Sequence, residues 1–206
     1  LTTVYQFAKA GLTAEDAAFV GVGSGASAVA ALLQGNVDAV SHLDPVISKL
    51  EAENAVKILV DMRTEEGTRA VFGGTNPAAV MYLKADFVKA NPNTVQALTN
   101  AFYKTLKWLE KATPEEIAAT VPEEYWLGDK ALYLKAVKSS LPTYSRTGLI
   151  PPDGMSSTLK FLETTEPASF KDAKIDIGRT FDPSFVKKAA ETIKWGVAGR
   201  ERRRAE

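Results

Sequence analysis

The sequence predicts an α/β fold built around a parallel β-sheet. Short apolar runs at residues 17–20, 37–42 and 56–60 alternate with segments whose apolar residues recur at helical spacing. Such alternation is typical of βαβ units, in which parallel strands are joined by helices. With 206 residues, of which 45% are hydrophobic and 24% charged, the chain has the composition of an ordinary globular protein.

Turn and capping residues divide the first third of the chain. An amphipathic helix over residues 4–10 ends at Gly11, and Thr13 is placed to cap the short turn that precedes the first strand. A glycine-rich turn at 21–25 leads into a helix that begins at Ser24 or Gly25. After the second strand, Asp44 and Pro45 have the pattern of an N-cap followed by proline at the first helical position.

The rest of the chain is predicted to be almost entirely helical. A polar stretch at 63–69 and the turn formers at 72–77 mark a crossing between domains, and 78–83 is predicted as one more strand. Helices are expected at residues 85–90 and 92–109, from residue 114, and at 132–141, 155–162 and 185–193. The Arg-rich tail at 200–204 is expected to be a solvated chain end. One strand cannot cover so many apolar helix faces. The helices could pack together as a bundle, but we rather expect a sheet outside this chain, and the chain to be a fragment of a larger two-lobed protein.

Charge and rare residues exclude several function classes. The 25 basic and 25 acidic residues balance, whereas nucleic-acid binders normally show a basic excess. The absence of cysteine excludes a disulfide scaffold, a thiolate metal site and a cysteine nucleophile, and a single histidine excludes a His-rich metal site. No apolar run approaches the ~18 residues of a membrane span. We expect no metal and no cofactor.

Five motifs occur in the order found in one known family. They are KAGLTAED at 9–16, AALLQGNVDA at 30–39, Asp44-Pro45, FVKANPNTV at 87–95 and FDPSFVKKA at 181–189. This ordered set resembles the C-terminal part of periplasmic substrate-binding proteins of ABC transporters for nitrate, sulfonate, taurine and bicarbonate, a superfamily that includes thiamine-precursor-binding proteins. The resemblance implies a type II periplasmic-binding-protein fold, with two α/β lobes around a cleft. Residues 1–69 would belong to the second lobe, and residues 70–206 would return to the first lobe, whose sheet would lie upstream of residue 1.

The glycine-rich turn is the first candidate ligand site. Gly23, Ser24, Gly25 and Ala26 stand where a helix begins after a predicted strand. Free N–H groups and the helix dipole at such a point favour an anion or a polar ligand, and the resemblance supports this interpretation. Glycines that serve only a tight turn are one alternative. Binding of a dinucleotide is another, because residues 21–26 fit the G-x-G-x-x-G/A pattern, although no acidic residue follows at the usual distance.

Two further pairs of residues are candidates for ligand contacts. His42 and Asp44 follow the end of a predicted parallel strand, where ligands of open α/β sheets bind. Gly74 and Asn76 lie in the predicted crossing, where a hinge could offer backbone and amide groups. The alternatives are a locally bonded histidine, a simple N-cap and a linker. A catalytic role for His42 and Asp44 is not expected, because no nucleophile stands in a recognisable motif.

The resemblance implies a binding protein rather than an enzyme. Such a protein captures a small polar or anionic solute, namely a sulfonate, nitrate, carboxylate or pyrimidine-like molecule, and delivers it to a membrane ABC permease. It would be periplasmic or lipid-anchored outside the cell, with no signal peptide in this chain. The rival hypotheses are an enzyme of thiamine-pyrimidine synthesis from the same superfamily, which relies on cysteines that are absent here, and a dinucleotide-binding α/β domain.

Overall fold

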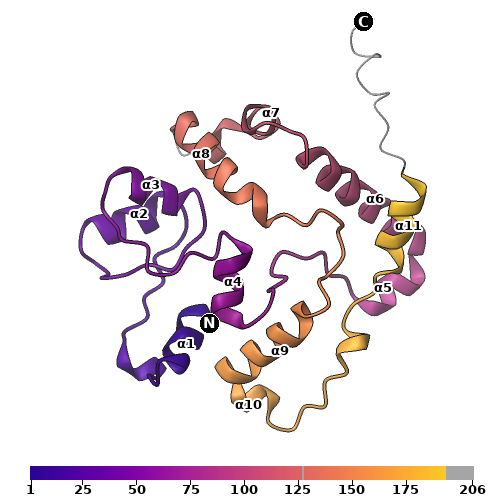
Figure 1. Ribbon diagram of the computed structural model, residues 1–206, viewed down its shortest axis with the longest axis horizontal. Helices are drawn as coiled ribbons and strands as arrows, with labels where there is room; N and C mark the ends of the chain where they lie inside the picture. Colours follow the sequence, from indigo (N-terminus) through magenta and orange to yellow (C-terminus); the bar gives the residue numbers. More distant parts are fainter. Residues whose placement is uncertain (127, 194–206) are drawn as a thin grey trace, which may run out of the picture. The chain divides into compact units, whose positions relative to one another are not determined.

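The computed structural model describes residues 1–126 and 128–193, which form two compact packing units (Figure 1). The first unit contains residues 1–77, 112–144 and 151–175, and the second contains 78–111, 145–150 and the described residues from 176 onward. The elements of the first unit are α1 (Thr2–Lys9), η1 (Ala14–Asp16), α2 (Ala26–Leu33), α3 (Val46–Ala52), α4 (Glu65–Phe72), α7 (Pro114–Ala118), η2 (Glu123–Trp126), α8 (Lys130–Ser140), η3 (Leu141–Thr143), α9 (Gly154–Thr165) and α10 (Pro167–Phe170). Those of the second are α5 (Ala85–Ala90), α6 (Pro92–Leu109), η4 (Ile177–Arg179) and α11 (Ser184–Thr192).

The described residues contain no β-strand, so the predicted parallel sheet is not present in this structure. The four segments predicted as strands, 17–20, 37–42, 56–60 and 78–83, lie between helices in irregular backbone. A helix closes its hydrogen bonds within itself, whereas a strand exists only when a neighbouring strand completes its ladder. Apolar runs of the right length are therefore not sufficient to form a sheet in the described part of the chain.

Helices α2 and α3 pack around a small core in the first unit. Ala28 and Val29 from α2 and Val46 and Leu50 from α3 form its buried centre. The half-buried residues Val22, Leu32, Val40 and Val56 pack against this core. Val40 and Val56 belong to the second and third predicted strands, and Val22 follows the first. These segments therefore place apolar side chains against the helices as the strands of an α/β layer would, without the ladder.

A second core of the first unit joins α1, α4 and α9. The ring of Tyr5 lies 5.7 Å from that of Phe72 and 5.3 Å from that of Phe161, and Val71 completes the buried cluster. Lys9 donates to the carbonyl oxygens of Ala70 and Val71 at 3.0 and 2.7 Å, where the C-terminal end of α4 leaves acceptors unpaired. Three helices that are distant in sequence, α1, α4 and α9, therefore pack together through the rings of Tyr5, Phe72 and Phe161.

Helix α4, which covers most of the polar stretch at 63–69, was not predicted from the sequence. Thr64 caps it by accepting a hydrogen bond from the Gly67 amide, and Glu65 and Glu66 stand in its first turn. It ends at Gly73, whose φ of 73° lies in the left-handed region that glycine adopts readily. The helix runs through residues 69 and 70, where the domain crossing was predicted to begin.

In the second unit, α6 and α11 pack against each other. Val95, Tyr103 and Ala189 are buried, and the amide of Gln96 donates to the carbonyl oxygen of Phe185 at 2.9 Å. The opposite face of α6 stays open to solvent, because Phe102 is 58% exposed. The two helices therefore cover part of each other's apolar surface and leave part of it bare.

Several predicted helix boundaries are confirmed. Thr13 forms a capping box with Asp16, Gly25 is the N-cap of α2, and Pro92 begins α6. Helix α3 begins one residue later than predicted, at Val46, while the Asp44 carboxylate accepts a hydrogen bond from the Ser48 amide at 2.9 Å.

The predicted tail at 200–204 lies outside the described residues. Within those residues, no helix is both long enough and apolar enough to span a membrane.

Candidate functional site

The turn that precedes α2 presents backbone groups to solvent. Gly23 and Gly25 have φ angles of 73° and 60°, which few residues other than glycine adopt easily. Gly23, Ser24 and Ala26 are exposed, and Gly25 is half-buried. Of the described side chains, none caps the N-terminus of α2. The first N–H groups of the helix can therefore be satisfied by water or by a ligand.

His42 joins this turn to the loop that follows the second predicted strand. Its Nε2 atom lies 3.2 Å from the carbonyl oxygen of Gly23, and its Nδ1 atom lies 3.3 Å from that of Leu43. Both neighbours are acceptors, so only the ring protonated on both nitrogens donates to the two at once. In this structure the histidine holds the glycine turn in place, which is a positioning role.

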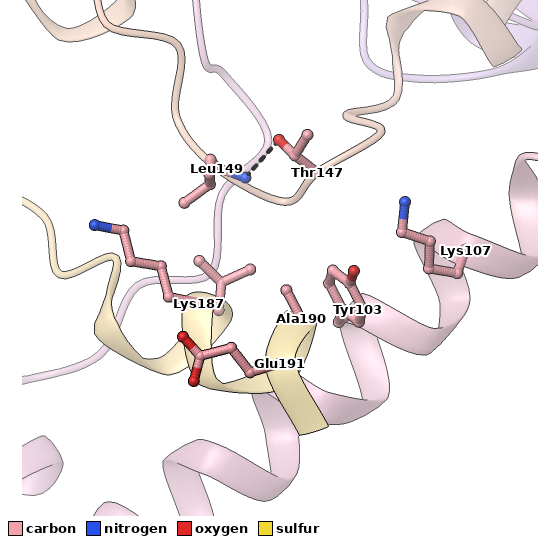
Figure 2. Close-up of a pocket in the computed structure, with 8 residues that line it drawn as sticks. Tyr103, Lys107, Thr147, Leu149, Lys187, Ala190 and Glu191 are labelled. Atoms are coloured by element: carbon pink, nitrogen blue, oxygen red, sulfur yellow. Dashed lines mark hydrogen bonds between the residues drawn. The ribbon is translucent and has the colours of Figure 1, made fainter. Parts of the chain in front are cut away.

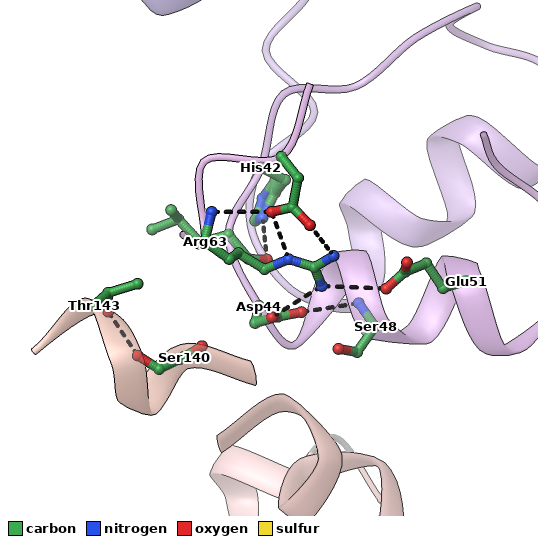
Figure 3. Close-up of polar contacts among 9 residues, drawn as sticks. His42, Asp44, Ser48, Glu51, Arg63, Ser140 and Thr143 are labelled. Carbon is green, nitrogen blue, oxygen red and sulfur yellow. Dashed lines mark hydrogen bonds and ion pairs between the residues drawn. The ribbon is translucent and has the colours of Figure 1, made fainter. Parts of the chain in front are cut away.

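Asp44 lies beside His42 in sequence but makes a different set of contacts (Figure 3). Its side chain is only 5% exposed, and it lies 3.4 Å from the guanidinium of Arg63. Arg63 also contacts the carboxylates of Glu51 at 3.1 Å and Asp61 at 2.7 Å. Asp44 thus caps α3 and anchors Arg63, so its carboxylate is engaged within the protein.

Arg63 is the residue of this region that sequence reasoning did not single out. Hydrogen bonds from Arg63 lower the pKa of Asp61, and the same contacts, with Glu51 and Asp44, raise the pKa of Arg63. The partners are separated from Arg63 by 2, 12 and 19 positions, a pattern with no local signature.

Within the described residues, no group of acidic or histidine side chains is arranged to hold a metal ion.

Gly74 and Asn76 are held against the N-terminal part of α9. Gly74 is buried, and a Cβ atom there would come within 3.0 Å of the Cβ of Ser157. The side-chain oxygen of Asn76 accepts a hydrogen bond from the Thr158 hydroxyl at 3.0 Å. These contacts fix the predicted hinge segment to α9, whereas the contacts of His42 run to the glycine turn.

Asp153 makes this attachment firm. It accepts hydrogen bonds from the Thr75 hydroxyl at 2.8 Å and the Thr75 amide at 3.2 Å, and it pairs with Arg69 at 2.6 Å. The Thr75 hydroxyl, followed by Arg69, lowers the pKa of Asp153 to about 2. Ser157 also donates to the carbonyl oxygen of Thr75. Segment 72–77 is therefore hydrogen-bonded to α9 and its N-cap Asp153 through two consecutive residues, Thr75 and Asn76.

The second unit carries a separate surface cavity of about 350 Å³ between α6, α11 and the 145–150 loop (Figure 2). Val186 and Leu149 are among its apolar lining residues, and Lys107, Lys187 and Glu191 add charges of both signs. The Lys107 ammonium already donates to Glu110 at 2.6 Å and to the carbonyl oxygen of Arg146 at 2.7 Å. None of the predicted ligand residues lines this cavity.

A family model described as the NMT1-like family matches residues 1–122, which is more than half of the chain. The chain belongs to the NMT1-like family. This family is part of the nitrate, sulfonate and taurine group of ABC substrate-binding proteins, so the resemblance inferred from the five motifs is confirmed. NMT1-like proteins are mainly substrate-binding proteins rather than enzymes.

A solved structure of a protein from Bordetella bronchiseptica RB50 is similar to this NMT1-like chain. The two share 45% sequence identity and superpose with a TM-score of 0.86 over 92% of this chain. The matched part makes up 59% of the Bordetella protein, so this chain spans less than two thirds of that relative. No curated protein matches the chain.

Proposed function

We propose that this NMT1-like chain is part of the solute-binding component of an ABC importer. The solute would be a small polar or anionic molecule, namely a sulfonate, nitrate, a carboxylate or a pyrimidine-like compound. It would be captured in a cleft between two lobes of a type II periplasmic-binding-protein fold and delivered to a membrane permease. The protein would act in the periplasm or anchored by lipid outside the cell. No chemistry on the solute is required.

The observation that carries this proposal is the contact between His42 and the glycine turn. Membership of the NMT1-like family supports a solute-binding role. In open α/β folds, ligands bind beyond the carboxyl ends of strands and at helix N-termini. Here one histidine nitrogen lies within hydrogen-bond distance of Gly23, so the end of one predicted strand meets the turn after another.

We propose Gly23, Ser24, Gly25 and Ala26 as the part of the site that touches the solute. Their exposed backbone and the start of α2 offer N–H donors and the positive end of a helix dipole. His42 and Asp44 would support the site without touching the solute. His42 would position Gly23, and Asp44 would fix the start of α3. Gly74 and Asn76 would form a hinge-side wall of the cleft, held by α9.

The lobe division is the second part of the proposal. Residues 1–69 would belong to one lobe, and residues 70–206 would return to the other. The apolar surface left on α6 supports this division, because Phe102 is 58% exposed in the described structure.

Binding and compaction test the proposal together. Calorimetric titration of the protein with taurine, nitrate, a small carboxylate and a hydroxymethylpyrimidine should reveal saturable binding of one class. Small-angle scattering of the natural protein should then show a smaller radius of gyration with that solute than without it. Saturable binding of a nicotinamide dinucleotide, with none of the four solutes bound, would contradict the proposal.

A further inference from the structure

The cavity of the second unit lies on a charged face of α6 and not on the bare apolar face of that helix. Tyr103 and Lys107 line the cavity, whereas Leu98 and Phe102, which are 40% and 58% exposed, form the apolar face. Successive residues of an α-helix are turned by about 100° from each other, so Tyr103 and Phe102 face different directions. The cavity and the bare apolar surface are therefore separate features of α6.

The loop between η3 and α9 forms a fixed wall of this cavity. The Ser145 hydroxyl oxygen accepts a hydrogen bond from the Gly148 amide at 2.9 Å. The Thr147 hydroxyl oxygen accepts one from the Leu149 amide at 3.1 Å (Figure 2). Gly148 lies so close to α11 that an added Cβ atom would come within 2.9 Å of the Val186 side chain. The wall is thus held by the protein's own contacts before any ligand binds.

The hydroxyl group of Tyr103 is a polar group that the protein leaves without a partner. Tyr103 lines the cavity and is only 9% exposed. Within the described part of the chain, its hydroxyl makes no hydrogen bond. Tyrosine hydroxyls in buried positions usually find a hydrogen-bond partner. A ligand that carries an acceptor would supply the missing bond.

Lys107 brings a positive charge to the same side of the cavity (Figure 2). Its ammonium lies 5.6 Å from the centre of the Tyr103 ring. It donates to Glu110 and to the carbonyl oxygen of Arg146, at 2.6 and 2.7 Å. An ammonium group has three N–H donors, so one donor is left for a further acceptor. Together, the phenol and the ammonium favour an anionic group at this side of the cavity.

Helix α11 forms the opposite side, which has an apolar surface between two opposite charges (Figure 2). Val186 and Ala190 line this side, and Leu149 of the loop lies across from them. Lys187 and Glu191 are exposed, and neither forms an ion pair within the described residues. Their charges cancel, so this side does not favour a second charged group. The volume of about 350 Å³ is at the lower end of the range of small-molecule sites, roughly 300–1,000 Å³.

We infer that this cavity binds a small carboxylate with an apolar body. The Tyr103 hydroxyl and the remaining N–H donor of Lys107 would donate to the carboxylate. The apolar body would lie against Leu149, Val186 and Ala190. The inference does not rest on the proposed solute site, because no residue of the glycine turn lines this cavity.

Methyl NMR of the protein tests the inference, with 3-phenylpropionate as the probe. We expect saturable shifts of the methyl signals of Leu149, Val186 and Ala190. The uncharged 3-phenylpropanamide should bind about fivefold more weakly, because hydrogen bonds to a carboxylate are stronger than those to an amide. Shifts confined to Ala28 and Val29 of α2 would place the probe at the glycine turn and overturn the inference. Equal affinity for the two probes, or no saturable shift at millimolar probe, would also overturn it.

Two variants and a control show whether the named contacts bind the probe. Tyr103→Phe removes only the hydroxyl group and keeps the packing of the ring, and it should weaken binding roughly tenfold. Ala190→Leu adds volume to the cavity from an exposed position of α11, so the protein should fold and the saturable shifts should disappear. Tyr125→Phe removes a hydroxyl group from η2 in the other unit and should leave the affinity unchanged. Unchanged affinity in either cavity variant would overturn the inference.

Discussion

The Nε2 atom of His42 lies 3.2 Å from the carbonyl oxygen of Gly23, a contact between residues 19 positions apart. Through it, the loop after the second predicted strand holds the turn that begins α2. The second ring nitrogen lies 3.3 Å from the carbonyl oxygen of Leu43, and the tautomer decides which of the two nitrogens donates. The histidine therefore acts on the proposed solute site through the backbone of the glycine turn.

Replacing His42 by alanine should loosen that turn. One hydrogen bond of this kind contributes about 1 kcal/mol, so we expect roughly a fivefold loss of solute affinity in calorimetric titration. His42→Gln, which keeps a side-chain donor, should retain more of the affinity. If both variants bind the solute as the unmodified protein does, the contact with Gly23 has no part in binding.

A negative charge at the start of α2 should oppose an anionic solute. Ser24→Asp should weaken binding by about 1–3 kcal/mol, through lost hydrogen bonding and repulsion between like charges. Ser24→Asn is the matched control, because its side chain has nearly the same size and no charge, and its loss should be smaller. Unchanged affinity of Ser24→Asp for an anion would exclude this turn as the binding point.

Removal of Arg63 should destabilise the protein more than removal of a second, exposed arginine. Arg63→Gln leaves Asp44, only 5% exposed, without its cation, and we expect a loss of about 2 kcal/mol in the free energy of unfolding. Arg69→Gln breaks pairs with Glu65 and Asp153 that are more exposed, so a clearly smaller loss is expected. Urea denaturation measures both, and equal losses would contradict the importance of the Arg63 cluster.

Acid should weaken the attachment of segment 72–77 to α9. The pKa of Asp153 is lowered to about 2 from an ordinary value of 3.8. A lowered folded-state pKa means that the stabilisation is complete above about pH 4 and is lost as the pH falls toward 2. Asp153→Asn should remove this part of the pH dependence in denaturation experiments between pH 2 and 5. An unchanged profile would show that Asp153 is not responsible.

Local sequence signals predicted the helices well. Thr13, Gly25 and Pro92 each mark an observed boundary, because caps and helix-starting prolines act within a few residues. Helix α4 was missed although Thr64 and Gly73 carry the same kinds of signal. The polar composition of residues 63–69 suggested a loop and outweighed these two caps.

The strands and the Arg63 cluster depend on distant residues. Val56 has the expected partners in α2 and α3, but a ladder also requires a neighbouring strand, which the described residues do not supply. Asp44 was singled out for its place after a strand, and only the structure shows that Arg63 engages its carboxylate. Gly74 and Asn76 were placed in the solute site from sequence, and their attachment to α9 is likewise a long-range contact.

Amide hydrogen exchange of the protein, with and without the solute that titration identifies, tests the central claim most directly. We predict that the solute slows exchange at residues 24–28, where α2 begins, and in the 42–44 loop, while residues 185–192 of α11 exchange as before. Slowed exchange confined to α11 and the cavity beside it, or no change at residues 24–28 under saturating solute, would contradict a solute site at the glycine turn.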